Sequence, residues 1–167
     1  MSTLPDITKD ITKICDNARK VKRAHFIAAE RKRLTHNIVG VTLIVISVLI
    51  TSNLVESIFT TSASVVVIKI LAFIAAVLAG IQTFFNFQKN VESHLAAGRS
   101  YAKLQHKANV LLATAKKSTF SEDELWKEYN ILSDEYLQAN TDFEAYVPSN
   151  NDFNKARTEI QKQETTN

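Results

Sequence analysis

Two long stretches almost free of charge constrain the fold of this chain more than any other feature. No charged residue occurs from Ile38 to Val55, and Lys69 is the only one from Ala63 to Phe87. A helix needs about 20 apolar residues to cross a bilayer core of about 30 Å, and a longer helix can tilt. Helices buried in a globular domain rarely stay uncharged on every face over this length. We therefore predict two transmembrane helices in an all-α chain, with the lipid bilayer as a partner.

The charges that flank these stretches predict the orientation of the chain. Residues 1–36 carry nine Lys or Arg against four acids, and residues 89–117 carry six against the single acid Glu92. The connection, residues 56–62, has no Lys or Arg. Because positively charged flanks stay on the cytosolic side, we expect both termini in the cytosol. The first stretch starts too late for a cleaved signal peptide, so we expect it to remain as an anchor.

Heptad-like spacing predicts that the polar parts form a helical bundle or coiled coil. Apolar or small residues recur in steps of three and four along three segments, which we call seams. The first seam contains Ile7, Ile11, Ile14, Ala18, Val21, His25 and Ala28; the second contains Ala97, Tyr101, Leu104, Ala108, Leu111 and Ala115; the third contains Leu125, Tyr129, Leu132, Tyr136, Ala139, Phe143 and Tyr146. Ser121 and Glu124 fit a capping box before the third helix, and Pro148 is expected to end it. The tail from Asp152 is expected to fray, with room for a further short helix before it does.

The spans and seams together predict a long hairpin. If both polar helices continue the spans without a break, antiparallel partners have numbers that sum to about 125, which places His25 beside Tyr101. The hairpin would then be about 80–90 Å long at the usual helical rise. The expected parts are a cytosolic N-terminal helix (1–37), a first transmembrane helix (38–55), a short external loop (56–62), a second transmembrane helix (63–87), a cytosolic helix that continues it (88–117), and a C-terminal amphipathic helix with a tail (118–167).

Small and polar residues gather on one face of each span. Small residues four apart let helix backbones approach closely in lipid, so these faces either pack spans and subunits together or line a pore between subunits. The single intramembrane charge, Lys69, either snorkels to the outer interface or forms a ring at an outer pore mouth. The residues concerned are Gly40, Ser47, Thr51, Lys69, Ala72, Ala76, Gly80 and Thr83.

No catalytic or cofactor-binding pattern emerges from the sequence. A glycine-rich phosphate loop is missing, and the four histidines have no Cys or carboxylate at metal-ligand spacing. We predict no enzyme, no cofactor, no metal site and no nucleic-acid partner, and we interpret His25 as a packed core residue. Basic residues before the first span either signal topology and contact lipid phosphate or receive a phosphate-bearing ligand. They are Arg19, Lys20, Lys22, Arg23, Arg31, Lys32 and Arg33.

Two stretches give the chain a resemblance to a known family. Residues 24–31, read AHFIAAER, precede the first span, and residues 78–87, read LAGIQTFFNF, end the second. With the histidine and tyrosine that follow, residues 20–160 resemble the SLATT domains, the SMODS- and SLOG-associating two-transmembrane effector domains. The positions that carry the resemblance are His25, Phe26, Glu30, Arg31, Phe84, Asn86, Phe87, His94 and Tyr101.

The resemblance implies a function that the residues alone do not give. It implies an oligomeric pore-forming effector of a bacterial antiphage or conflict system, located in the inner membrane. Members of the family are associated with nucleotide second-messenger synthases or nucleotide-sensing domains. The expected trigger is therefore a sensor protein or a nucleotide second messenger. Two alternatives remain open: a membrane-anchored helical interaction module without pore activity, and a holin-like lysis protein.

Overall fold

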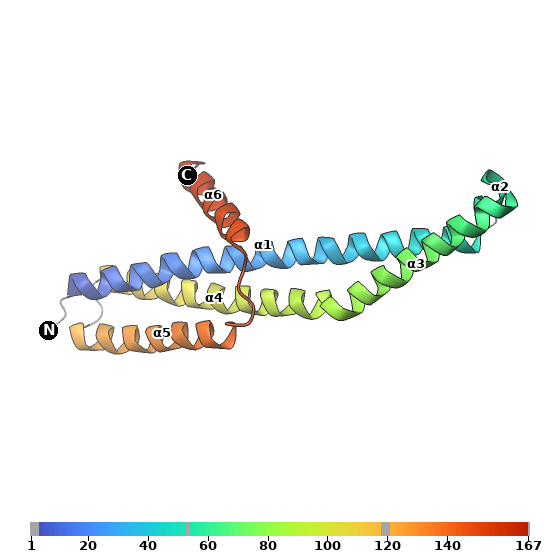
Figure 1. The fold of residues 1–167 in the computed structure, drawn as a ribbon. Helices are drawn as coiled ribbons and strands as arrows, with labels where there is room; N and C mark the ends of the chain where they lie inside the picture. The colour runs from blue at the N-terminus through green and yellow to red at the C-terminus, as the bar shows by residue number, and fades with distance from the viewer. Residues whose placement is uncertain (1–3, 53, 118–120, 167) are drawn as a thin grey trace. The chain divides into compact units, whose positions relative to one another are not determined.

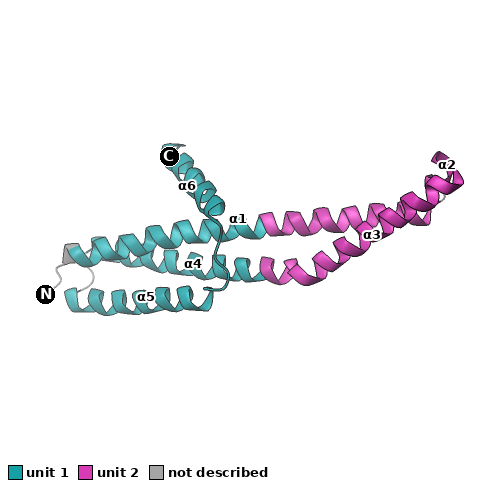
Figure 2. Ribbon diagram, in the orientation of Figure 1, with its two compact units in different colours: residues 1–30, 92–167 teal, residues 31–91 magenta. Residues whose placement is uncertain are grey.

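The computed structural model describes residues 4–52, 54–117 and 121–166, and these ranges are almost entirely helical. Six helices lie in them: α1 (Leu4–Thr51), α2 (Leu54–Ile58), α3 (Thr61–Phe85), α4 (Phe87–Lys116), α5 (Glu122–Asp142) and α6 (Asn150–Thr166) (Figure 1). They form two compact units, residues 1–30 with 92–167 (unit 1) and residues 31–91 (unit 2) (Figure 2). The predicted all-α fold is confirmed.

Unit 1 contains a core built by α1, α4 and α5, and the three predicted seams supply most of it. Their steps of three and four keep apolar side chains on one stripe of each helix, so three stripes can meet in one core. The buried residues of this cluster are Ile7, Ile11, Cys15, Ala18, Ala97, Tyr101, Leu104, Ala108, Leu111, Leu125, Leu132 and Ala139.

Contacts between α1 and α4 in unit 1 follow the expected antiparallel register. The Cys15 thiol donates to Oδ1 of Asn109 over 3.2 Å. Further along both helices, the ring of Phe26 lies against Gly98, where an added Cβ would meet the ring at 2.7 Å. Gly98 therefore supports close packing in the middle of a helix, where glycine would otherwise lower helix stability.

The C-terminal region contains a second helix that is longer than the short one considered for the tail from Asp152. The capping box at Ser121 and Glu124 is present, so α5 begins as predicted. However, α5 ends at Asp142, well before Pro148, and a second helix, α6, runs from Asn150 to Thr166. The backbone N–H of Asp152 donates to the Ser149 hydroxyl over 3.3 Å, and the Asp152 carboxylate accepts from the Ser149 backbone N–H over 3.0 Å. This reciprocal cap satisfies orphan N–H groups and starts α6.

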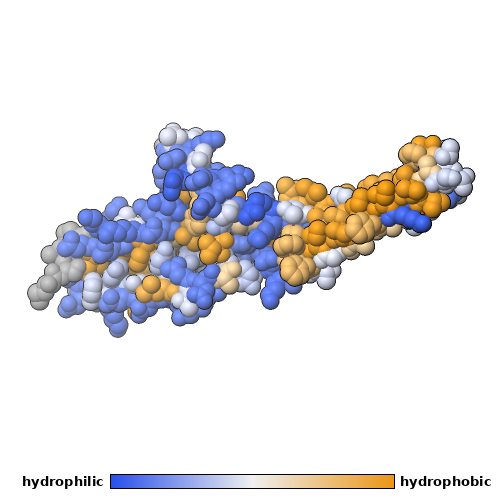
Figure 3. All heavy atoms as spheres, viewed as in Figure 1, coloured by the Kyte–Doolittle hydropathy of each residue, from blue (hydrophilic) through white to orange (hydrophobic). Residues whose placement is uncertain are grey.

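Unit 2 consists of the C-terminal part of α1, α2, α3 and the first residues of α4. Within it, α1 and α3 are long and apolar enough to cross a membrane. Most of the large apolar side chains here are exposed: Val48 is 55% exposed, Phe73 70% and Phe84 83%. Hydrophobic residues accordingly cover most of the face of this unit seen in Figure 3. Such surface is stable in lipid, where apolar side chains need no protein cover.

The connection between the two apolar helices contains a short helix. α1 ends at Thr51, α2 covers Leu54–Ile58, and α3 begins at Thr61. Val55 in α2 and Ser64 in α3 are both buried, at 5% and 2% exposure. The region expected to be a loop over residues 56–62 is thus partly helical.

The expected unbroken second helix is interrupted at Asn86. This residue has φ 40° and ψ 54°, the left-handed conformation, and it separates α3 from α4. Asparagine tolerates this conformation better than other residues with a Cβ. The side chain of Asn90 donates to the Phe85 carbonyl over 2.9 Å, and Asn86 Oδ1 accepts from the Lys89 backbone N–H over 3.4 Å. Two asparagines therefore pair backbone groups at the break, which the helical pattern alone did not indicate.

Candidate functional site

The two apolar helices of unit 2 contact each other through a polar pair as well as apolar side chains. Gln82 Nε2 on α3 lies 3.4 Å from Nδ1 of His36 on α1. Its side chain also covers Gly40, where an added Cβ would lie 3.8 Å from Nε2. Gly40 therefore belongs to the packing face between the spans. Gln82 was not among the expected site residues. Its position as a polar residue within the apolar second span, close to the small-residue stripe, was a signal that could have identified it.

The small-residue stripe of α3 faces away from α1. Ala72 and Ala76 are exposed, and an added Cβ at Gly80 would meet no atom within 4 Å. Packing of the two spans inside one chain therefore does not use this stripe. Lys69 is exposed as well.

The hydroxyl groups predicted to line or pack the spans are satisfied within their own helices. Ser47 donates to the Leu43 carbonyl over 2.9 Å, and Thr51 donates to the Ser47 carbonyl over 2.9 Å. Thr83 donates to the Ala79 carbonyl over 3.0 Å. A hydroxyl bonded in this way remains an acceptor, so these residues can lie in lipid or face a water-filled space without an unpaired donor.

Three of the positions that carry the family resemblance meet in the core of unit 1. Nδ1 of His25 lies 3.1 Å from Nδ1 of His94, and both rings are buried. The ring of His25 also stacks on Tyr101, with centroids 5.7 Å apart, and Tyr101 donates to Oδ1 of Asn140 over 2.7 Å. Burial, and then the neighbouring His94, lower the pKa of His25 to about 4. At neutral pH His25 is therefore uncharged, which agrees with a packed core histidine.

The remaining positions of the resemblance lie in other surroundings. Phe26 packs on Gly98. The rings of Phe84 and Phe85 meet edge to face at 5.3 Å, and Phe85 stacks with Phe87 at 5.8 Å. Asn86 occupies the helix break, and Glu30 and Arg31 are exposed.

The seven basic residues expected before the first span fall into two groups. Arg31, Lys32 and Arg33 lie in unit 2, whereas Arg19, Lys20, Lys22 and Arg23 lie in unit 1. In unit 1 the two arginines contact α6: Arg19 forms an ion pair with Glu164 at 2.5 Å, and Arg23 forms one with Glu159. The docking of α6 on these arginines was not expected from the sequence.

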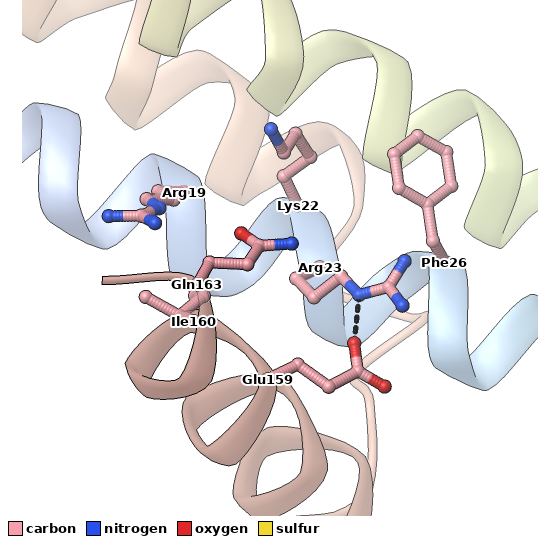
Figure 4. A pocket seen from close by; sticks show the side chains of 7 residues that line it. All are labelled: Arg19, Lys22, Arg23, Phe26, Glu159, Ile160 and Gln163. Carbon is pink, nitrogen blue, oxygen red and sulfur yellow. Dashed lines mark hydrogen bonds and ion pairs between the residues drawn. The ribbon is translucent and has the colours of Figure 1, made fainter. Parts of the chain in front are cut away.

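A cavity of about 320 Å³ lies between α1 and α6 in unit 1. Figure 4 shows Arg23 extending from α1 toward Glu159 on α6, whereas the side chain of Lys22 points away from this pair. Lys22 donates to Oε1 of Gln105 over 2.7 Å, so its partner carries no charge. The lining residues are Arg19, Lys22, Arg23, Phe26, Glu159, Ile160 and Gln163.

No group of three or more His, Cys, Asp or Glu within the described residues could hold a metal ion. The two apolar helices and the packed polar unit define a class, helical proteins with two candidate membrane spans. More specifically, the chain belongs to the SMODS and SLOG-associating 2TM effector domain family 4, whose model matches residues 10–167. The predicted family is confirmed, and the family description and the two apolar helices fit a membrane effector. No curated protein and no solved structure matches the chain.

Proposed function

We propose that this chain is a pore-forming effector of a bacterial antiphage or conflict system. It spans the inner membrane twice, keeps both termini in the cytosol and acts as an oligomer. Unit 2 carries the pore, and unit 1 receives the signal from a sensor protein or a nucleotide. The family description and the exposed apolar helices support the membrane part of this proposal.

The single observation that carries the oligomeric part is the outward-facing stripe of α3. Ala72, Ala76 and Gly80 are exposed on α3, and Gly80 has open space around it. In lipid, small residues four apart mark a face where another helix can approach closely. Since α1 does not occupy this face, a second subunit is the partner that we propose for it. Two helices cannot enclose an aqueous path, so a pore requires several subunits.

The test measures membrane potential with a voltage-sensitive dye in bacteria that express the chain alone or with its neighbouring genes. We expect depolarisation when the signal is present, and we expect Gly80→Leu to abolish it. An added Cβ at Gly80 would meet no atom within 4 Å, so we expect the hairpin itself to persist. Val77→Phe, on an exposed position of α3 outside the stripe, is the matched control and should depolarise like the wild type.

The outcomes separate the proposal from its alternatives. An unchanged potential under every condition, with membrane insertion verified by fractionation, would leave a membrane-anchored interaction module. Rapid cell lysis instead of depolarisation would indicate a holin-like protein. Equal depolarisation by Gly80→Leu and wild type would mean that the small-residue stripe is not required for assembly of the pore.

A further inference from the structure

Within unit 1, helix α6 packs on α1 through a small apolar cluster of its own. Ala156 and Ile160 on α6 are buried, and Phe153 is half-buried. Ala156 packs with Ala24 and Ile27 of α1, with Phe153 against them, in a cluster separate from the main core of α1, α4 and α5. The two clusters share no buried residue.

The ionic contacts that accompany this cluster are weak individually. The side chains of Arg23 and Glu159 are each 41% exposed, and those of Arg19 and Glu164 are 28% and 58% exposed. Ion pairs with this much solvent access contribute little, because water and salt screen the attraction. A ligand with more negative charge than one carboxylate can therefore compete for these arginines.

The cavity between α1 and α6 has an excess of positive charge. Three cations, Arg19, Lys22 and Arg23, line it with one carboxylate, Glu159. Glu164 pairs with Arg19 beside the cavity, so three positive charges against these two carboxylates give a formal charge of +1. Burial, and then the charges of Arg19 and Arg23, lower the pKa of Lys22, as expected where like charges are incompletely neutralised. The volume of about 320 Å³ is within the range of small-molecule sites.

Phosphate is the chemistry that this arrangement fits best. The planar guanidinium group of an arginine can form two parallel hydrogen bonds to phosphate oxygens, and a lysine adds a point charge. The carboxylate of Glu159 already occupies one such position on Arg23. A phosphate group can take the same position and carries more charge.

We propose that the cavity between α1 and α6 binds a phosphate-bearing anion through Arg19, Lys22 and Arg23, in competition with Glu159. The ligand is either a soluble nucleotide polyphosphate or the headgroup of an anionic phospholipid, since both offer the same phosphate oxygens. Binding releases Glu159 and weakens the attachment of α6. The idea that this binding triggers the effector rests on the function proposed above. The binding itself is measured without any measurement of conductance, so the binding proposal and the pore proposal can fail separately.

The experiment titrates the full-length chain in neutral detergent micelles by calorimetry. The soluble probes are ATP and inorganic pyrophosphate, and the lipid probe is dioctanoyl phosphatidic acid with dioctanoyl phosphatidylcholine as its counterpart. We expect Arg23→Gln and Lys22→Gln each to weaken binding about tenfold, as is usual for a hydrogen bond to a charged group. We expect Glu159→Gln to tighten binding about two- to fivefold, because the competing ion pair is lost.

Lys155→Gln is the matched control, because it removes one positive charge from an exposed position of α6 that does not line the cavity. Circular dichroism verifies that each variant keeps its helix content. Binding of the soluble probes with opposite responses to Arg23→Gln and Glu159→Gln supports a free ligand, and the same pattern with phosphatidic acid alone supports a headgroup. Absence of binding by every probe, or equal weakening by Lys155→Gln and Lys22→Gln, would overturn the proposal.

Discussion

The buried pair of His25 and His94 should make the stability of unit 1 depend on pH. The pKa of His25 is about 4 in the folded chain, against 6.5 for an unperturbed histidine, because burial and then His94 oppose its charge. The unfolded chain therefore binds the proton first as the pH falls. The contribution to stability is complete above about pH 6.5 and is lost progressively toward pH 4.

The size of the effect follows from the shift in pKa. Between pH 7.5 and pH 4.5, protonation of His25 in the unfolded chain alone should lower the free energy of unfolding by about 2.5 kcal/mol, at 1.36 kcal/mol per unit.

The assay is urea unfolding in micelles, followed by tryptophan fluorescence. The chain has one tryptophan, Trp126, and it lies in α5, so its emission reports on unit 1. We expect His25→Asn to lower stability at pH 7.5 and to remove most of the pH dependence. His106→Asn replaces an exposed histidine and should keep the wild-type dependence. An equal loss of stability between pH 7.5 and 4.5 in wild type and His25→Asn would refute this explanation.

Three further outcomes follow from the packing. Gly98→Ala should destabilise unit 1 by about 1–2 kcal/mol in urea unfolding, because its Cβ would lie 2.7 Å from the Phe26 ring. Adding Phe26→Leu should restore part of this loss, and unchanged stability of Gly98→Ala would contradict the contact. Asn86→Gly should leave the melting temperature measured by circular dichroism nearly unchanged. Asn86→Val should lower the stability by about 1–2 kcal/mol, which is the cost of the left-handed conformation for a residue with a Cβ. Equal melting temperatures of the two variants would be inconsistent with the observed φ. Cys15 is buried and hydrogen-bonded to Asn109, and burial raises the pKa of its thiol. It should therefore react with maleimide only after urea is added, and rapid labelling of the native chain would disprove this placement.

The sequence was sufficient to predict the core of unit 1, because that core is made by regular spacing within each helix. The seams place Ile11, Leu104 and Leu132 on apolar stripes, and all three are buried. The capping box at Ser121 and Glu124 was predictable for the same reason, since both partners are close in sequence. Local patterns of this kind depend on helix geometry alone.

Features that depend on contacts between distant segments were not predictable. The docking of α6 uses Arg23 and Glu159, which are far apart in the chain, and no single-sequence pattern links them. The existence of α6 had a local signal, the Ser149 and Asp152 cap, but Pro148 was interpreted as the end of the preceding helix. Asn86 lies inside an apolar helical pattern, and only its backbone conformation reveals the break.

The roles of the candidate membrane faces remain predictions. The small-residue stripe of α3 was recognised, but the sequence left open whether it packs on α1 or on another subunit. The exposed Gly80 favours another subunit, whereas Gly40 lies under Gln82 on the face between the spans. The two glycines thus have different surroundings that spacing alone could not distinguish.

The proposed function requires that unit 2 cross the bilayer twice and leave unit 1 in the cytosol. Its most direct test is labelling of single cysteines by a membrane-impermeant maleimide in bacterial spheroplasts, in a Cys15→Ser background. Ser57→Cys lies on an exposed position of α2, in the connection between the spans, and Lys127→Cys lies on an exposed position of α5. We expect Ser57→Cys to be labelled in intact spheroplasts and Lys127→Cys only after permeabilisation. Labelling of Lys127→Cys in intact spheroplasts, or protection of Ser57→Cys there, would contradict the account.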